Sequence, residues 1–350
     1  MTLTRRTTLA ALATPLLLTR PANAADRSIN VGTYTGPQGE FIRRFVIPRF
    51  QTDFSCRVFQ TEGVTLGQIS VLRTQKANPR YSVMFMDDVG VPVARDEGLI
   101  DPLPIDKMPN LARLIPRFLL TDKHAAAFAV SVVAPFFNTA ALSAVPTWEL
   151  LWDPKYKSRF LLVTPKQTQS VQMLVAATAL ATGKSFNEAQ YLVDQGWDKM
   201  AALKPNVQTV YDNNVTAVLQ VSQGQADIGG PDFGKTVLPF AMKKAPVAMS
   251  APREGVFGGV NTVTIVKNGP NPDLAAAFAD RMLEPATQKA LSEYTYAAPT
   301  VVGITLNAET AALVSYPESR MDDMKLMTVD WSVMNPKRGA IVEKFNSTFS

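Results

Sequence analysis

Short apolar runs alternate with amphipathic segments along the first part of the chain. The runs 28–34, 57–60 and 81–86 have the composition of strands, and the segments 40–50 and 66–76 between them place apolar residues at helical spacing. This strand–helix–strand–helix–strand order is typical of a sheet of parallel strands with helices packed on its faces. The first part of the chain is therefore predicted to form an α/β block.

A second alternating block follows a proline-dotted stretch and two apolar runs, 125–133 and 135–138. Its expected strands and helices lie, in that order, at 160–163, 207–211, 226–229 and 245–249, and at 171–181, 187–203, 215–221 and 233–243. A last strand at 260–266 and helices at 274–283 and 337–349 complete the pattern. The sequence thus predicts two α/β blocks that change over near residues 133–137.

Polar side chains stand just after many of the predicted strands. Two open α/β lobes bind ligands in the crevice between them, at the carboxyl ends of the strands. The resulting candidate contacts are Tyr34, Thr35, Asp87, Asn138, Lys166, Asn213 and Asp232. Asn213 and Asp232 also precede predicted helices, so helix capping competes with a pocket role for both of them. Asp88 is expected to cap the helix that follows it.

Motifs that carry catalytic or metal chemistry are incomplete. Residues 182–185 (TGKS) resemble the end of a phosphate loop, but Thr178 stands where that motif needs glycine, so Gly183 is interpreted as a helix end. His124 and Cys56 are the only histidine and cysteine of the chain, which excludes a disulfide framework and multi-histidine metal sites. His124 is interpreted as a loop residue and Cys56 as a small core residue. We therefore expect recognition rather than catalysis, with no cofactor.

The first 24 residues have the layout of a cleaved secretory signal. Arg5 and Arg6 precede an apolar run at 9–18, and Ala22-Asn23-Ala24 provides a cleavage site. A twin-arginine route for folded proteins and a route for unfolded chains both remain open. The segment contains three arginines and no acids, so cleavage lowers the formal net charge from +5 to +2. That balance argues against a nucleic-acid partner and, with the signal, predicts a periplasmic protein.

Five segments resemble, in order along the chain, a family of bacterial extracellular solute-binding proteins. They are residues 95–103 (RDEGLIDPL), 135–139 (PFFNT), 151–157 (LWDPKYK), 224–228 (GQADI), and 261–278, in which Asn-Pro at 271–272 precedes Leu-Ala. The resemblance is to the branch that serves ABC importers of polyamines, thiamine, iron and aminophosphonates. Each segment is weakly specific alone, whereas the ordered set covers nearly the whole chain after the signal.

The resemblance implies a two-lobed α/β periplasmic-binding-protein fold, of the venus-flytrap type, with the ligand in the cleft between lobes. The expected division is a signal at 1–24, a first lobe from 25–134 with 262–303, and a second lobe from 135–261 with 304–350. The implied partners are a small-molecule ligand and an inner-membrane ABC permease with its ATPase, and the protein is expected to be a monomer and not an enzyme. A membrane sensor as partner, and an enzyme on the same scaffold, are the rival classes.

Departures from the family pattern bear on the ligand. Polyamine binders of the branch carry an aromatic residue and an aspartate where this chain has Gly259 and Asn261, and an acidic pair where it has Pro165 and Lys166. Iron binders carry two tyrosines where residues 231–233 (PDF) stand. A zwitterionic or anionic organic solute is therefore favoured, and a polyamine or thiamine-like cation is the alternative. With these matches the expected contacts also include Phe137, Ser170 and Asn261. Lys166 would pair with a ligand anion if it faces the cleft, and would otherwise be a surface lysine.

Overall fold

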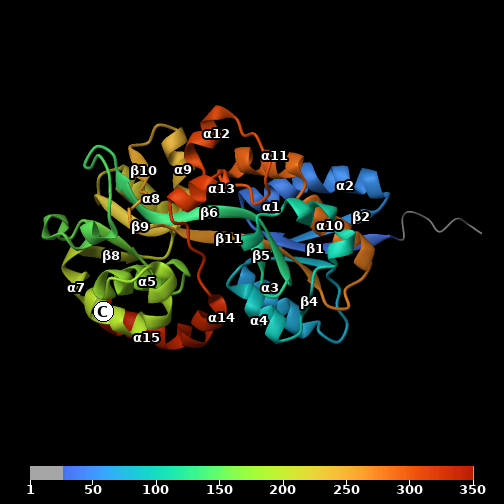
Figure 1. Cartoon of the computed structure of the whole chain (residues 1–350), viewed down its shortest axis with the longest axis horizontal. Coiled ribbons are helices and arrows are strands. Elements are labelled where there is room, and N and C mark those ends of the chain that lie inside the picture. Colours follow the sequence, from blue (N-terminus) through green and yellow to red (C-terminus); the bar gives the residue numbers. More distant parts are fainter. Residues whose placement is uncertain (1–26, 350) are drawn as a thin grey trace, which may run out of the picture.

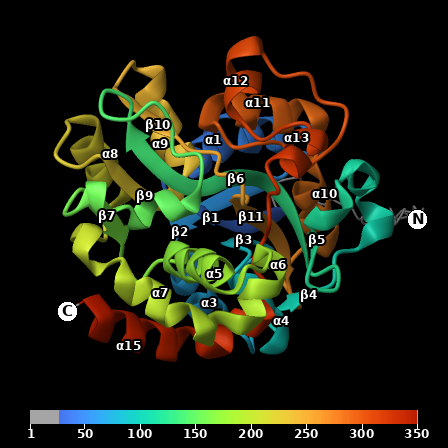
Figure 2. The same cartoon turned by 60° about the vertical axis from the view of Figure 1, so that its left-hand side comes forward.

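The computed structural model describes residues 27–349, so the predicted signal peptide lies outside the described residues. Within residues 27–349, eleven strands form one continuous sheet whose main path runs β2-β1-β3-β11-β6-β9-β7-β8. Helices cover both faces of the sheet (Figures 1 and 2). The predicted α/β class is confirmed.

Each end of the sheet consists of parallel strands, as the alternating pattern predicts. At one end β1 (Ser28–Tyr34) pairs with β2 (Arg57–Gly63) and β3 (Val83–Asp87). At the other end β7 (Phe160–Val163) pairs with β8 (Val207–Tyr211) and β9 (Ile228–Phe233). Helical crossovers connect strands of this kind and place their carboxyl ends on one edge.

Two long antiparallel strands join these ends and correct the prediction of a parallel sheet. β6 (Ala125–Asn138) pairs with β11 (Phe257–Val266), and they are antiparallel to their outer neighbours β9 and β3. The two apolar runs at 125–133 and 135–138 form one strand because Pro135, which lacks an N–H, lies at a register shift between Ala134 and Phe136. Figure 1 shows β6 passing from one part of the molecule into the other. Three short strands pair at the margins: β4 (Ile100–Asp101), β5 (Leu119–Leu120) and β10 (Val247–Met249).

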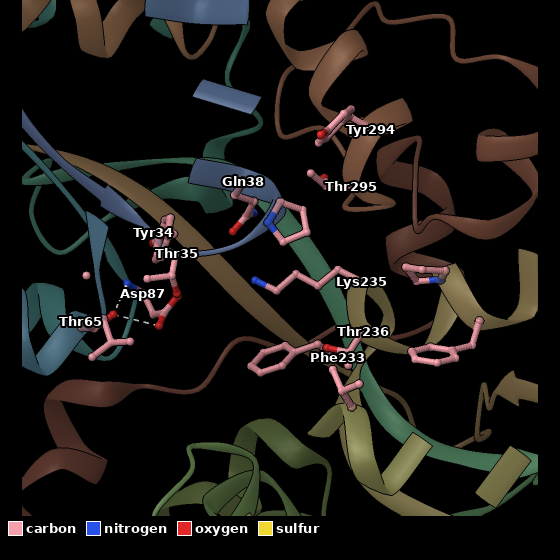
Figure 3. Close-up of a pocket in the computed structure, with 16 residues that line it drawn as sticks. Tyr34, Thr35, Gln38, Thr65, Asp87, Phe233, Lys235, Thr236, Tyr294 and Thr295 are labelled. Atoms are coloured by element: carbon pink, nitrogen blue, oxygen red, sulfur yellow. Dashed lines mark hydrogen bonds between the residues drawn. The ribbon is translucent and has the colours of Figure 1, made fainter. Parts of the chain in front are cut away.

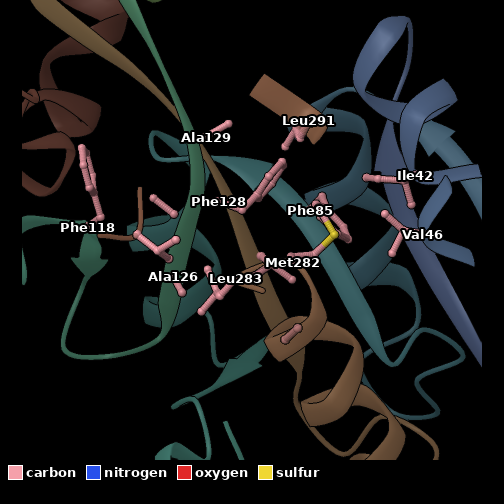
Figure 4. Packing of buried hydrophobic residues seen from close by; sticks show 14 of the residues in the cluster. Ile42, Val46, Phe85, Phe118, Ala126, Phe128, Ala129, Met282, Leu283 and Leu291 are labelled. Carbon is pink, nitrogen blue, oxygen red and sulfur yellow. The ribbon is translucent and has the colours of Figure 1, made fainter. Parts of the chain in front are cut away.

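The helices of the first part enclose a core of aromatic and aliphatic side chains. Among them Ile42, Val46, Phe85, Phe128 and Leu291 are at most 3% exposed (Figure 4). The surrounding helices are α1 (Pro37–Phe41), continued by a π-helical turn (Ile42–Val46) into α2 (Ile47–Phe54), then α10 (Pro272–Arg281) and α11 (Pro285–Thr295). α3 (Thr65–Thr74) and α4 (Gly90–Asp96) pack on a separate apolar cluster around Met84 and Met86. The apolar spacing along these helices accounts for the buried faces.

A second core lies around Trp148 and Phe257 in the other part. Its helices are α5 (Gln169–Thr182), α6 (Phe186–Ala189), α7 (Trp197–Ala202) and α15 (Arg338–Phe349). α8 (Asn214–Ser222) and α9 (Gly234–Met242) pack on a separate apolar cluster around Phe136 and Tyr211. The single helix predicted at 187–203 is wrong, because a 3₁₀ segment (Gln190–Gly196) with a non-helical Leu192 separates α6 from α7. A side chain at Gly196 would overlap Thr178 of α5, so glycine allows this segment to pack closely on α5.

The segment after α11 contributes to both cores. α12 (Ala308–Leu313), α13 (Glu318–Asp323) and α14 (Trp331–Met334) follow one another along it. Val314 and Met321 pack in the first core, whereas Trp331 and Ile341 pack in the second. The chain therefore passes between the two parts a third time, after β6 and β11.

Four smaller expectations concern single residues. Gly183 ends α5 in the left-handed conformation, with φ of 68°, as expected of a helix end. Cys56 is buried and unpaired, and the His124 ring bonds through Nδ1 to the Thr121 carbonyl at 2.9 Å. Asp88 does not cap α4, because its carboxylate accepts the N–H of the adjacent Val89 instead. Among residues 27–349, none of the helices combines the length and the hydropathy that a membrane span requires.

Candidate functional site

A cavity of 440 Å³ lies between the two parts of the molecule, at the carboxyl ends of the parallel strands. The ends of β1 and β3 and the starts of α1 and α3 contribute from one side, and α8, the end of β9 and α9 contribute from the other, with α11 beside them. Figure 3 shows these residues around the space. The lining residues are Tyr34, Thr35, Pro37, Gln38, Gly63, Val64, Thr65, Asp87, Val215, Phe233, Lys235, Thr236, Pro239, Phe240, Tyr294 and Thr295.

Two opposite charges stand on the two sides of this cavity. Asp87 ends β3, and its carboxylate accepts a hydrogen bond from Thr65 Oγ1 at 2.9 Å. Lys235 is the second residue of α9, and its half-buried side chain extends toward the side formed by Gln38 and Asp87 (Figure 3). Its Nζ lies 5.1 Å from the centre of the Phe233 ring, within range of a cation–π contact.

Asn261 of β11 connects the two charges. Its Oδ1 accepts hydrogen bonds from Gln38 Nε2 at 2.8 Å and from Lys235 Nζ at 3.0 Å, and its Nδ2 donates to Asp87 Oδ1 at 2.7 Å. The residue is only 2% exposed, so these bonds satisfy an amide that water does not reach. No ion pair within 4.0 Å joins Asp87 to Lys235 in the described part of the chain.

Burial shifts the pKa of two groups that line the cavity. The pKa of Lys235 is lowered, mainly because burial disfavours the ammonium, while Asp87, Asp232 and Asp88 act in the opposite direction. The pKa of Tyr34 is raised well above its ordinary value, first by burial and then by the negative charge of Asp87. The Tyr34 phenol therefore keeps its proton. Its hydroxyl is buried and has no hydrogen-bond partner among the described residues.

Asp232 lies directly behind the cavity wall and is fully buried. Its carboxylate accepts the N–H of Phe233 at 2.6 Å, the Asn214 amide at 2.8 Å and the Tyr211 hydroxyl at 3.3 Å. Burial is the largest cause of a pKa raised to about 7, and these hydrogen bonds limit the rise. Its side chain neither caps α9 nor lines the cavity.

Of the predicted contacts, Tyr34, Thr35 and Asp87 line the cavity, and Asn261 lies beneath it. The structure brings these four residues together from β1, β3 and β11, although 174 positions separate Asp87 from Asn261. This grouping occurs because β11 pairs with β3 in a register that places Asn261 opposite Asp87.

The other predicted contacts lie outside this cavity. Phe137 packs in the second core, and the buried Asn138 side chain donates to the Val221 carbonyl at 2.7 Å. The Ser170 hydroxyl bonds to the Gln167 carbonyl at 2.8 Å.

Two further candidates lie at the protein surface and at the start of a helix. Lys166 is exposed after β7, and its backbone carbonyl accepts a hydrogen bond from Arg338. Asn213 caps α8, because its Oδ1 accepts the Thr216 N–H at 2.9 Å.

Several lining residues escape the sequence analysis, above all Lys235, Phe233 and Gln38. Phe233 follows Asp232 directly, so the rule that led to Asp232 could have reached it, whereas Lys235 lies in the first turn of α9. Tyr294 could not have been found in this way, because α11 was not predicted at all. No group of three or more His, Cys, Asp or Glu side chains that could hold a metal ion occurs within residues 27–349.

The chain belongs to the family of bacterial extracellular solute-binding proteins, whose profile matches residues 82–342. A curated relative is the spermidine/putrescine-binding periplasmic protein 1 of Haemophilus influenzae, 23% identical over 229 residues. That match spans 63% of this chain and 61% of the Haemophilus protein, which is less than two thirds of the relative's length.

Solved structures share the whole two-lobed fold. An ABC transporter protein from Clostridium perfringens has a TM-score of 0.80 at 19% identity, over 92% of this chain and all of the other. The periplasmic binding protein AfuA from Actinobacillus pleuropneumoniae, with fructose-6-phosphate bound, has a TM-score of 0.71 at 18% identity over 93% of this chain and 99% of its own. These likenesses establish the predicted two-lobed periplasmic-binding-protein fold.

Proposed function

We propose that this protein is the periplasmic substrate-binding component of an ABC importer. In this function it captures a small organic solute in the cavity between its two parts and delivers it to an inner-membrane permease with its ATPase. The observation that carries the proposal is a 440 Å³ cavity built from both parts of a two-lobed solute-binding fold. The predicted signal at 1–24 supports a periplasmic location, by either export route.

The solute is proposed to carry a negative charge, as an anion or as a zwitterion. Lys235 supports this, because an anionic group on the solute would compensate a half-buried ammonium. A polyamine is the second candidate, and Asp87 together with the name of the Haemophilus relative favours it. Against a polyamine, its ammonium groups would share the cavity with Lys235, and like charges in a partly buried site repel each other.

Closure of the two parts around the solute is the proposed mechanism of capture. Three chain segments connect the parts, and residues from both parts line the cavity. Contacts to the solute from both sides are complete only when the parts approach, so binding stabilises the closed arrangement. The side chains at the cavity can bind and orient a solute, which is the function shared by members of this family.

Thermal unfolding of the mature protein against a solute panel tests this function. The panel contains amino acids, carboxylates, phosphonates, thiamine, putrescine and spermidine. A compound present at a hundredfold its dissociation constant adds about 2.7 kcal/mol to the unfolding free energy, which gives a measurable shift of the midpoint. Uptake of the active compound by cells with and without the gene then separates an importer component from a receptor for a membrane sensor. Absence of any shift across the panel would contradict solute binding.

A further inference from the structure

We infer that the solute is a zwitterion, bound with its cationic group beside Asp87 and its anionic group beside Lys235, around a mainly apolar body. This inference rests on the proposed function and specifies the solute that the cavity accepts. It assigns Asp87 and Lys235 as residues that determine specificity.

Two opposite charges face the cavity without forming an ion pair with each other. Asp87 and Lys235 both line the cavity. The Asn261 amide hydrogen-bonds to Lys235 through its oxygen and to Asp87 through its nitrogen. Oppositely charged side chains this close attract each other strongly in a partly buried site. Their separation is maintained because Asn261 is itself fixed by Gln38 and by its place in β11.

Enclosing an unpaired charge away from water is unfavourable unless the charge gains a partner. A purely cationic solute would pair with Asp87 and would offer Lys235 no counter-charge of its own when the cavity closes. A purely anionic solute would pair with Lys235 and would offer no counter-charge to Asp87. A zwitterion provides a counter-charge for both residues at once, and it is therefore the class that the cavity binds most tightly.

The groups around each charge agree with this orientation. Beside Asp87, the Tyr34 hydroxyl is buried and unpartnered among the described residues, and its oxygen can accept an N–H from a bound amine. Beside Lys235, Thr236 lines the cavity in the first turn of the nine-residue α9. The amino end of a helix carries a partial positive charge, which adds to the attraction for an anion at this position.

The remaining wall sets the character of the solute between its charged ends. Val64, Val215, Pro239, Phe240 and Tyr294 supply apolar or aromatic surface from both sides of the cavity. Such a wall favours a solute with a hydrocarbon or aromatic body over one with hydroxyl groups all around it, because sugar hydroxyls would lose their hydrogen bonds to water.

Matched sets of compounds that differ only in charge test the inference. One set is L-phenylalanine with its N-acetyl and amide forms, and another is ε-aminocaproate with caproate and hexylamine. Putrescine, spermidine and succinate complete the panel. Dissociation constants are measured by calorimetry for every compound that shifts the unfolding midpoint. We expect the tightest compound to be a zwitterion, bound at least about tenfold more tightly than either singly charged relative.

Two variants assign the charges. In Lys235→Met the preference for the zwitterion over its amine should fall to about threefold or less, and in Asp87→Asn the preference over its acid should fall likewise. Lys243→Met is the matched control, since Lys243 is exposed at the other end of the same helix. This control should keep the affinities of the native protein. Should Asp87→Asn fail to fold, Lys235→Met alone decides the result for the anionic end.

The outcomes separate the inference from the proposed function. A singly charged compound that binds more tightly than every zwitterion of the panel overturns the inference and leaves solute binding in place. An unchanged preference in Lys235→Met overturns it as well. If no compound of the panel binds, the proposed function fails together with the inference.

Discussion

The ring of Phe233 occupies the space that a side chain at position 259 would need. A Cβ at Gly259 would overlap the Cδ1–Cε1 edge of this ring and would lie 3.2 Å from Val133 Cγ2. Gly259 belongs to β11 and Phe233 ends β9, so the missing side chain of one strand admits the aromatic side chain of another. Polyamine binders of the branch carry an aromatic residue at the position of Gly259. In this chain the ring of Phe233, from another strand, lines the cavity instead.

Gly259→Ala is expected to displace the Phe233 ring and to weaken solute binding. Forcing one methyl group into this packed position should lower the free energy of unfolding by about 1 to 3 kcal/mol. Urea unfolding measures this loss, and calorimetry with the tightest panel compound measures binding. Gly339→Ala is the control, because Gly339 is helical, exposed and has open space around its Cα. The control should be unchanged or more stable by about 0.5 kcal/mol. Equal stability of the two variants would contradict this packing.

Asn261→Leu should destabilise the protein and reduce solute affinity together. The substitution keeps the size of the side chain but removes three hydrogen bonds from a residue that is 2% exposed. A loss of about 2 to 4 kcal/mol is expected, because Gln38 and Asp87 lose a buried partner. Without the amide between them, Lys235 and Asp87 can pair directly and compete with the solute.

Thr264→Val on the same strand provides the comparison for Asn261→Leu. Its buried hydroxyl makes one hydrogen bond, to the Met84 carbonyl at 2.7 Å, away from the cavity. Its loss should cost about 1 kcal/mol and leave solute affinity intact. A smaller cost for Asn261→Leu than for Thr264→Val would argue against the network at Asn261.

Asp232 should make the protein less stable as the pH rises from about 4 to about 7. With its pKa raised to about 7, the folded protein holds a proton that the unfolded chain has already released above its ordinary pKa near 4. The unfolding free energy therefore falls across this window and is unaffected by this group above it. Between about pH 5 and about pH 8 the contribution is on the order of 3 kcal/mol.

The measurement compares urea unfolding of the native protein and of Asp232→Asn at these two pH values. The variant cannot titrate at this position, so its stability should change less between the two conditions. Comparing the change in each protein cancels the contribution of the other titrating groups. Identical changes in both proteins would show that Asp232 keeps an ordinary pKa.

Asn213→Ala should lower the unfolding free energy by about 1 kcal/mol, because the helix α8 loses its cap. Asn213→Ser keeps a capping oxygen and should restore most of that loss. Thermal or urea unfolding of the three proteins checks the order. If the alanine and serine variants were equally destabilised, a contact other than the cap would account for the stability that Asn213 contributes.

Local pattern predicted much of the fold. The predicted ranges of β1, β7 and β8 agree with the structure, since each is a short apolar or β-prone run ended by turn residues. The direction of β6 and β11 could not be predicted, because strand direction depends on which segments pair across the chain. The close approach of Gly196 to Thr178 of another helix could not be predicted either, because it joins separate segments.

The site was predictable only where a residue ends a strand and that end lies at the cavity. Tyr34, Thr35 and Asp87 meet both conditions. Asn138 and Asn213 stand at the ends of strands as well, but their side chains are hydrogen-bonded to backbone groups. Lys235 was missed because its position follows from the start of α9 and from Asn261, a residue on a later strand.

The order of the strands along the chain differs from their order in the sheet. β11 is the last strand of the described chain, yet it lies between β3 and β6 at the middle of the path. While the chain folds, the two earlier groups of strands therefore keep their facing edges unpaired until the segment 257–266 docks between them. Long-range pairing of this kind slows folding. The sheet, and with it the contact of Asn261 with Asp87, is accordingly complete only when β11 has paired with both β3 and β6.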